Sequence, residues 1–403
     1  MEQLRSVQQH SFTPAEFARI AGAQPVPDLV EPLRAARLSR SLLLLSYVLR
    51  TTPGLQRARV LLAEAHEADR GAVNELLVSP WTVARIVAAV REPGDPRHQR
   101  RVAALSLAAA ARAGLAGPGI EVVPEDGRVA VPTLGGLDLP EPSRVSAADL
   151  RGPGWQPIRS LTADHTGLRV SVQLDDVDPY RDIHAVPALT RLAPARVEAL
   201  DRIFDGACGL LATYAPGRLG ELAAGLRSIV LLDGEGRQSA TNEEAFGGLA
   251  TTMPNDSLQL LVVLVHEFHH SKLAAVDSLA RLTRSRHPGR YFAPWRREMR
   301  PLLSLLHGIF AFTAVAMLFW DLSAGSRLRD VALPEFALVR AQVRAALAGL
   351  SPADPGLTAA GRLLVTELAG STAELDRLPV PPAVAAEAEA RVAEARRALD
   401  RSP

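Results

Sequence analysis

The segment LQLLVVLVHEFHHSKL, residues 258–273, decides the fold around the candidate site of this chain. Three consecutive residues that favour helix N-caps precede it, at 255–257. The apolar run that follows predicts a buried helix from Leu258 onward. Within that helix His266 and His270 are four residues apart, so both imidazoles are expected on one face, one turn from each other.

His266, Glu267 and His270 together match the pattern H-E-x-x-H. Two imidazoles at this spacing can bind one metal ion, and the glutamate can reach a metal-bound water or a substrate. We therefore predict a metal site with His266 and His270 as ligands and Glu267 as the catalytic carboxylate. The alternative is that these are surface groups, or core histidines paired with acids. His269 projects about 100° from His270, and we interpret it as a polar neighbour of the site.

Two histidines do not complete a metal site, so a third ligand is expected downstream. The candidates are Asp277, His287, Glu298 and His307. Asp277 lies about two helical turns beyond the motif, while Glu298 and His287 lie in polar or arginine-rich loops. His307 is the ionisable group of the apolar run 302–320, and a buried imidazole needs a partner. We favour His307; the alternative is a core histidine bonded to a carboxylate.

The remaining sequence predicts an α+β fold that is predominantly α-helical. The chain is 47% hydrophobic and 22% charged, which is typical of a globular protein. We expect the metal-binding helix to pack against a second long apolar helix at 302–320, with a small β-sheet in the middle of the chain. We divide the chain into an N-terminal helical region (1–117), a catalytic core (118–330) and a C-terminal helical region (331–403).

Composition also bears on partners and location. Cys208 is the only cysteine, so an internal disulfide and a cysteine-based metal site are excluded. The net charge is +1, without a basic tract interleaved with aromatics, so we expect no nucleic-acid partner. The first residues lack an apolar signal segment. The run at 302–320 has nearly the length of a membrane span, but a lone histidine in lipid is costly, so we predict a buried helix, no membrane partner and a cytoplasmic protein.

Four segments give the chain a resemblance to a known family: VHEFHHSKL (265–273), YFAPWRREMRPLLSLLHGIFAF (291–312), LDDVDPYRD (174–182) and FGGLATTMP (246–254). Together they span roughly 165–320. The chain resembles the HExxH-motif proteins of ribosomal peptide gene clusters, which are described as 2-oxoglutarate-dependent, HExxH-type peptide β-hydroxylases. The block at 291–312 is the most specific part, because many metallopeptidases share the HExxH motif.

The resemblance implies Fe(II), 2-oxoglutarate and O2 as cofactor and co-substrates, and a ribosomally made precursor peptide as substrate. It implies His266 and His270 as iron ligands, with His307 at the position of the third. Arg296 and Arg300 match arginine positions expected to grip the carboxylate of 2-oxoglutarate. The usual iron site has two histidines and one carboxylate, so Glu267 and Glu298 remain alternative third ligands.

Two other functions fit the same motif. In a zinc metallopeptidase, Glu267 is the general base for a zinc-bound water, and the segment AFGGLATT (245–252) is the edge strand that pairs with substrate. A non-catalytic peptide-binding protein with a structural metal is the other possibility. Arginines at 296 and 300 distinguish the hydroxylase, since a peptidase has no need for them near its metal.

Overall fold

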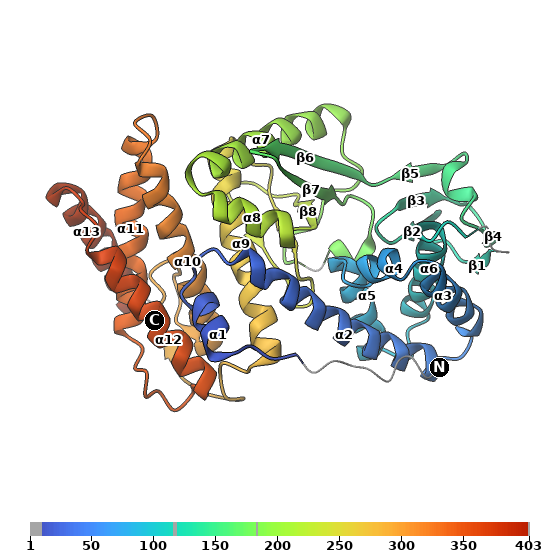
Figure 1. Cartoon of the computed structure of the whole chain (residues 1–403), viewed down its shortest axis with the longest axis horizontal. Helices are drawn as coiled ribbons and strands as arrows, with labels where there is room; N and C mark the ends of the chain where they lie inside the picture. The colour runs from blue at the N-terminus through green and yellow to red at the C-terminus, as the bar shows by residue number, and fades with distance from the viewer. Residues whose placement is uncertain (1–9, 116–118, 183, 402–403) are drawn as a thin grey trace.

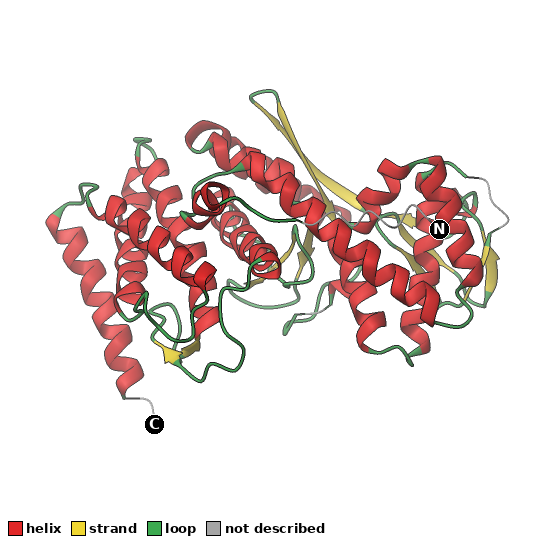
Figure 2. Ribbon diagram, turned by 60° about the horizontal axis from the view of Figure 1, so that its bottom comes forward, coloured by secondary structure: helices red, strands yellow, loops and turns green. Residues whose placement is uncertain are grey.

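The computed structural model describes residues 10–115, 119–182 and 184–401. Helices make up 57% of the structure and strands 13%, which confirms a predominantly helical α+β fold. Figure 1 shows an elongated molecule in which α3 to α6 and the small sheets lie at one end and α10 to α13 at the other. Figure 2 shows the same arrangement with helices in red around few strands.

One end of the molecule has its own hydrophobic core. Four helices pack there against short antiparallel strands, and the second half of α2 (Pro27–Thr51) also contributes. The helices are α3 (Gln56–Ala68), α4 (Arg70–Leu77), α5 (Pro80–Arg91) and α6 (Pro96–Arg112). The strands are β1 (Ile120–Val122) with β4 (Ser143–Val145), and β2 (Arg128–Val131) with β3 (Gly135–Asp138) and β5 (Trp155–Pro157); the turn η2 (Asp149–Arg151) precedes β5.

A five-stranded mixed sheet forms the centre of the molecule, in the order β6-β7-β8-β10-β9. Its middle pairs are parallel and its outer pairs antiparallel. The strands are β6 (Arg159–His165), β7 (Leu168–Leu174), β8 (Ser228–Leu231), β9 (Ser239–Ala240) and β10 (Gly248–Thr251). The connections between them carry the turn η3 (Pro179–Arg181) and the helices α7 (Pro194–Tyr214) and α8 (Pro216–Gly225).

The order of the strands corrects one expectation. In the zinc peptidase alternative the segment 245–252 would be an edge strand, but β10 lies between β8 and β9 and is hydrogen-bonded on both sides. Its four residues are all buried. The edge beside it is β9, because that strand pairs with β10 alone.

The second large core surrounds α9 (Ser257–Leu279) and α10 (Leu302–Ser323), which pack along each other as expected. Side chains such as Leu305, Leu306 and Ile309 are fully buried there, and burial of each stabilises the fold by about 1.5–3 kcal/mol. The other elements around them are α1 (Pro14–Ala21), α11 (Arg329–Ala348), α12 (Ala359–Asp376) and the hairpin of β11 (Arg290–Tyr291) with β12 (Arg300–Pro301). Helix α13 (Pro382–Asp400) packs on α11 through a separate small cluster.

Each of the two hydrophobic cores contains residues from more than one of the three regions that we predicted from the sequence. Residues 120–150 pack with α3 and α6 at the N-terminal end, whereas α1 and the first part of α2 pack against the core of α9 and α10. Helices α11 and α12 belong to that same core. The boundaries after 117 and 330 therefore remain predictions about sequence organisation, and the packing does not follow them.

Helix α10 is long and apolar enough to cross a membrane, with a mean hydropathy of 2.1. Within its apolar window 78% of the residues are buried inside the protein, which is the environment of a core helix. The consecutive helices α4 and α5 pass the same test only if taken together, and they are bent by 69°. The burial of α10 is compatible with a soluble protein.

Candidate metal centre

Helix α9 carries the predicted ligands and starts where the sequence indicated. The Asp256 side chain caps it by accepting from the Gln259 N–H at 2.8 Å, a contact that stabilises a helix by about 1 kcal/mol. The helix then runs without a break to Leu279. Its regular period places His266 and His270 on the face that is turned towards α10.

The imidazoles of His266 and His270 approach each other as two ligands of one ion would. Their Nε2 atoms are 3.0 Å apart, and their rings are nearly perpendicular at 84°. An ion that binds two nitrogens at about 2.1 Å, with a right angle between the bonds, sets them about 3.0 Å apart. The pair thus fits adjacent positions around a six-coordinate ion.

His307 of α10 lies against the other edge of His270. The Nδ1 atoms of these two rings are 3.4 Å apart, and the rings are stacked with an angle of 28°. His270 therefore turns Nε2 to His266 and Nδ1 to His307. With one nitrogen from each ring, the three imidazoles do not all lie within 4.8 Å of one another. Binding of one ion by all three requires a ring of His270 or His307 to turn.

All three imidazoles are neutral at physiological pH. Burial lowers the pKa of His266 to about 4, and the nearby Arg296 charge lowers it further. Burial likewise lowers the pKa of His270 to about 3 and that of His307 to about 4. Each of these histidines is nevertheless partly exposed. Neutral imidazole is the state that binds metal.

Neither a family model nor a curated protein matches this chain. The assignment of the site therefore depends on its geometry.

Glu267 faces the edge of the sheet. Its carboxylate accepts hydrogen bonds from the Ser239 hydroxyl at 2.6 Å and the Thr241 hydroxyl at 2.7 Å. These hydroxyls belong to β9 and the residue after it, and the sequence analysis did not single them out. Because they alternate as Ser-Ala-Thr, the period of a strand would have placed both on one face. The carboxylate is buried, and its charge acts on His270.

The other polar residues of the motif have partners on separate elements. His269 Nδ1 lies 2.7 Å from the Val265 carbonyl, and its Nε2 lies 3.4 Å from Arg218 of α8. Lys272 forms a fully buried ion pair with Glu221 at 2.6 Å. His269 thus belongs to a buried charged network with Arg218, and its hydrogen bonds within the described part of the chain go to neither His270 nor His307.

The loop before α10 builds an aromatic wall beside the ligands. The ring of Trp295 packs on Phe312, and Phe312 packs on His266, with 4.7 Å between ring centroids in both cases. Trp295 can lie so close to α10 because Gly308 has no side chain: a Cβ there would stand 2.4 Å from the indole. Both aromatic side chains are partly buried.

The two predicted arginines differ in their surroundings. Arg296 is exposed, and its charge acts on both His266 and His270. Arg300 forms an ion pair with Glu298 on the same loop. The structure therefore brings Arg296 near the imidazoles, while Arg300 is engaged by a neighbouring carboxylate.

The other third-ligand candidates have different partners. Asp277 accepts from the Leu282 N–H at 2.8 Å, just beyond the end of α9, and pairs with Arg281. His287 lies 2.8 Å from the Tyr291 hydroxyl. Glu298 pairs with Arg300, as described above. His307 is the candidate that touches the His266–His270 pair.

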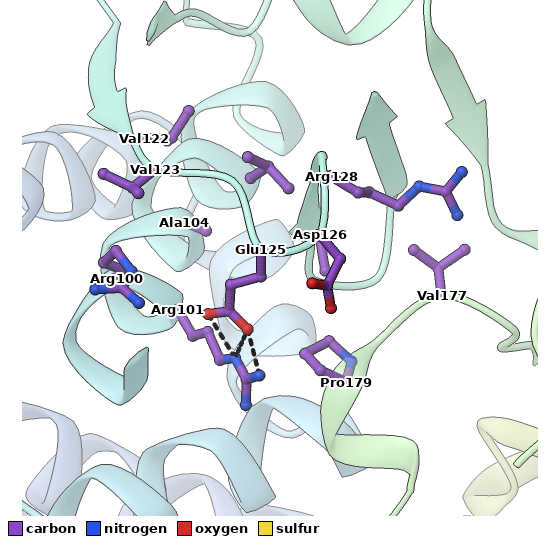
Figure 3. A pocket seen from close by; sticks show the side chains of 12 residues that line it. Arg100, Arg101, Ala104, Val122, Val123, Glu125, Asp126, Arg128, Val177 and Pro179 are labelled. Carbon is purple, nitrogen blue, oxygen red and sulfur yellow. Dashed lines mark hydrogen bonds and ion pairs between the residues drawn. The ribbon is translucent and has the colours of Figure 1, made fainter. Parts of the chain in front are cut away.

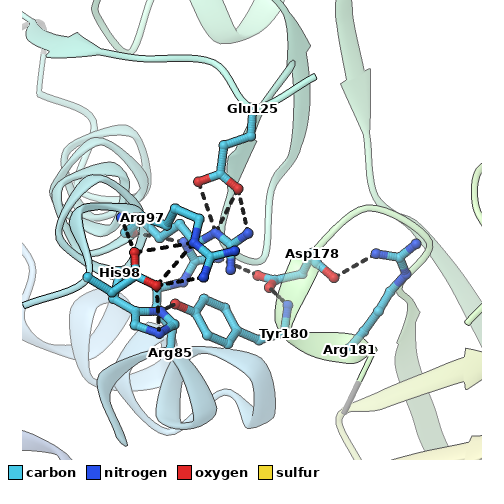
Figure 4. A network of polar contacts seen from close by, with 9 residues as sticks. Arg85, Arg97, His98, Glu125, Asp178, Tyr180 and Arg181 are labelled. Carbon is cyan, nitrogen blue, oxygen red and sulfur yellow. Dashed lines mark hydrogen bonds and ion pairs between the residues drawn. The ribbon is translucent and has the colours of Figure 1, made fainter. Parts of the chain in front are cut away.

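The run LDDVDPYRD contacts α5 and α6, away from the three imidazoles. Tyr180 lies between the guanidinium groups of Arg85 and Arg101, each 5.1 Å from its ring. Asp178 and Arg85 form a buried ion pair at 2.6 Å, and Figure 4 shows this pair beside Tyr180 and His98. The run fastens the central sheet to the N-terminal helices.

Two further features lie in this region. In the described part of the chain, Glu92, Asp95 and His98 are the one group of three metal-ligand side chains whose ligand atoms all lie within 4.8 Å. Asp95 is already held by Arg97, and exposed acidic groups are common without an ion.

A pocket lies beside Glu125 and Asp126 (Figure 3), and its volume is about 190 Å³. None of the predicted site residues lines it.

Proposed function

We propose that this protein is a cytoplasmic Fe(II)/2-oxoglutarate-dependent dioxygenase that hydroxylates the β-carbon of a residue in a ribosomally made precursor peptide. The observation that carries the proposal is the cluster of three neutral, partly exposed imidazoles, His266, His270 and His307. A site closed by four protein ligands would favour a structural metal. Cys208, the one cysteine of the sequence, is fully buried on α7.

In this proposal His266, His270 and His307 would hold the iron. When bound, iron with 2-oxoglutarate and O2 would supply the chemistry that hydroxylates a C–H bond, with succinate and CO2 as the other products. The protein contributes the binding and orientation of these groups.

Arg296 is the arginine available to bind the carboxylate of the keto acid, because it is exposed and acts on the imidazoles. An arginine suits this task, since its planar fork can bind a carboxylate through two hydrogen bonds. Arg300 can assist only after it leaves Glu298. Phe312 packs on His266 and Trp295 packs on Phe312, so the Phe312 ring shields one side of His266 from water.

The zinc peptidase remains the alternative that shares this motif. It needs Glu267 to activate a metal-bound water, but both carboxylate oxygens already accept from Ser239 and Thr241. This arrangement suits a carboxylate that fixes β9 against α9. A non-catalytic peptide-binding protein with a structural metal is the third possibility, and three histidines without a fourth cysteine ligand disfavour it.

Anaerobic loading with Fe(II) and 2-oxoglutarate tests the proposal. We expect a weak visible charge-transfer absorption band from the chelated keto acid, and we expect His266→Ala or His270→Ala to abolish it. Absence of the band in the unchanged protein, together with zinc-dependent peptide cleavage, would overturn the hydroxylase in favour of the peptidase.

A further inference from the structure

Strand β9 is an open edge beside the metal helix. It is the last strand of the five-stranded sheet and consists of Ser239 and Ala240. Ser239 is exposed, as are the turn residues that precede it. An edge strand presents backbone N–H and C=O groups that an extended chain can pair with.

The hydrogen bonds to β10 fix which backbone groups are free. Ser239 stands opposite Thr251, and the Thr252 N–H donates to the Gln238 carbonyl at 2.9 Å. In an antiparallel pair, alternate residues direct their N–H and C=O groups towards the partner strand. Gln238 and Ala240 therefore face β10, and the N–H and C=O of Ser239 point outward from the sheet.

The same residue is tied to the site through its side chain. The Ser239 hydroxyl donates to Glu267, the neighbour of His266 in α9, and Thr241 holds the same carboxylate from two residues further on. These hydrogen bonds hold the free edge of β9 against α9. The neighbouring face of α9 carries His266 and His270. Both histidines are partly exposed, and His266 directly precedes Glu267 in the helix.

We propose that the outer edge of β9 is the docking site of the peptide substrate, which binds as an added strand through the N–H and C=O of Ser239. Main-chain pairing supplies the register, and alternate side chains of the bound peptide then face α9 and its imidazoles. This inference rests on the proposed function and names how that site takes its substrate. The hydroxyls of Ser239 and Thr241 act as positioning groups, because they hold the edge against Glu267.

A tethered peptide tests the docking site without metal. Glu235→Cys, in the exposed turn before β9, provides the attachment point on the full-length chain. The native Cys208 is fully buried and burial raises its pKa to about 12, so a thiol reagent modifies the new cysteine alone. The probe is a decapeptide of alternating threonine and glutamine on a triglycine linker, which raises its effective concentration to about the millimolar range.

The readout is hydrogen exchange of the peptide's own amides, measured by mass spectrometry. We expect the peptide amide that pairs with the Ser239 carbonyl to exchange at least 10-fold more slowly than in the free peptide, and the fully N-methylated peptide to leave the Ser239 amide as rapidly exchanging as in the untethered protein. Exchange of the tethered peptide at the free rate overturns the proposal.

Ser239→Pro and Ser239→Ala form a matched pair of variants. Both lose the hydroxyl that binds Glu267, but only the proline loses the outward N–H, and proline is tolerated where a strand edge faces solvent. We expect weaker protection of the peptide amide in Ser239→Pro than in Ser239→Ala, because the proline variant keeps the carbonyl of residue 239 but loses the hydrogen bond that its N–H donates to the peptide; equal protection in both contradicts the proposal. Exchange of the α9 amides reports whether the proline variant is folded, and if it is not, the comparison with the N-methylated peptide decides alone.

The outcome separates docking from chemistry. The experiment contains no iron and no keto acid, so a failure of the hydroxylase in the loading experiment leaves the peptide result unchanged. A protected peptide on a chain that shows no charge-transfer band retains the docking site and loses only the proposed reaction.

Discussion

The Nε2 atoms of His266 and His270 lie 3.0 Å apart on successive turns of α9, and His307 reaches this pair from α10 at the far edge of His270. One helix therefore supplies a preformed pair, and a second helix supplies a ring that must adjust. This asymmetry leads to different expectations for the three histidines.

Removal of either member of the pair is expected to abolish metal retention. His266→Ala or His270→Ala leaves a single imidazole on α9, and one neutral nitrogen holds a divalent ion only weakly in competition with water. Metal content after gel filtration, measured by elemental mass spectrometry, gives the result. His66→Ala on α3 is the control and keeps its metal; unchanged metal in either site variant would falsify the site.

His307→Ala is expected to weaken the site without emptying it. Because the ring must turn to bind, we expect the affinity for Fe(II) or Co(II) to fall by about 10–100-fold, the range found for groups that support a metal site. Asp277→Asn is the comparison on α9. It keeps an oxygen that can accept from the Leu282 N–H and loses only the ion pair with the exposed Arg281, so it changes the melting temperature little and leaves metal affinity within a few-fold. Equal affinities of the two variants would remove His307 from the ligand set.

The lowered pKa values predict how the metal-free protein responds to pH. The unfolded chain binds protons on these histidines as pH falls through 6.5, whereas the folded chain does so only near pH 4 for His266 and His307 and near pH 3 for His270. Their contribution to stability is therefore complete above pH 6.5 and decreases from there towards pH 3–4. Each group adds a slope of up to about 1.4 kcal/mol per pH unit.

Urea unfolding of the metal-free protein between pH 5 and pH 7.5 measures that slope.

Because all three rings are already neutral, calorimetry at pH 7 in two buffers of different ionisation enthalpy is expected to show almost no proton release from them on metal binding. A release of about one proton or more for each ligand would mean that the rings are charged in the folded protein.

Gly308→Ala is expected to displace the aromatic wall. The added Cβ would stand 2.4 Å from the indole of Trp295, and such overpacking usually costs about 1–3 kcal/mol. The melting temperature falls, and tryptophan emission moves to longer wavelength as the indole becomes exposed. Gly370→Ala in α12 has open space around its Cβ and is expected to be neutral or stabilising by up to about 1 kcal/mol.

Lys272, the single lysine of the chain, tests the charged network behind the metal helix. Lys272→Met leaves the Glu221 carboxylate buried without its cation, a change that typically costs about 3–5 kcal/mol. Arg281→Met at the end of α9 breaks a pair whose arginine side chain is 77% exposed and is expected to cost less than about 1 kcal/mol. Chemical denaturation compares the two, and Lys272→Met combined with Glu221→Gln should recover part of the loss.

Much of this arrangement follows from local sequence. The caps at 255–257, the apolar run after them and the spacing of His266 and His270 determine a helix with two imidazoles on one face, because helical geometry repeats every few residues. The apolar run at 302–320 likewise determines a buried helix, and the structure extends it to Ser323. The predominance of helix over strand was predictable for the same reason.

Only the tertiary structure decided which groups surround the two imidazoles. His307 is 37 residues from His270, and Ser239 is 28 residues from Glu267, so no local period relates them. A strand of two residues is too short to predict from its pattern, and the order of strands that makes β9 the edge depends on pairing between distant segments. The sequence determines which residues share a face of one helix, because residues four apart lie one turn from each other. Tertiary packing determines which distant residues contact that face.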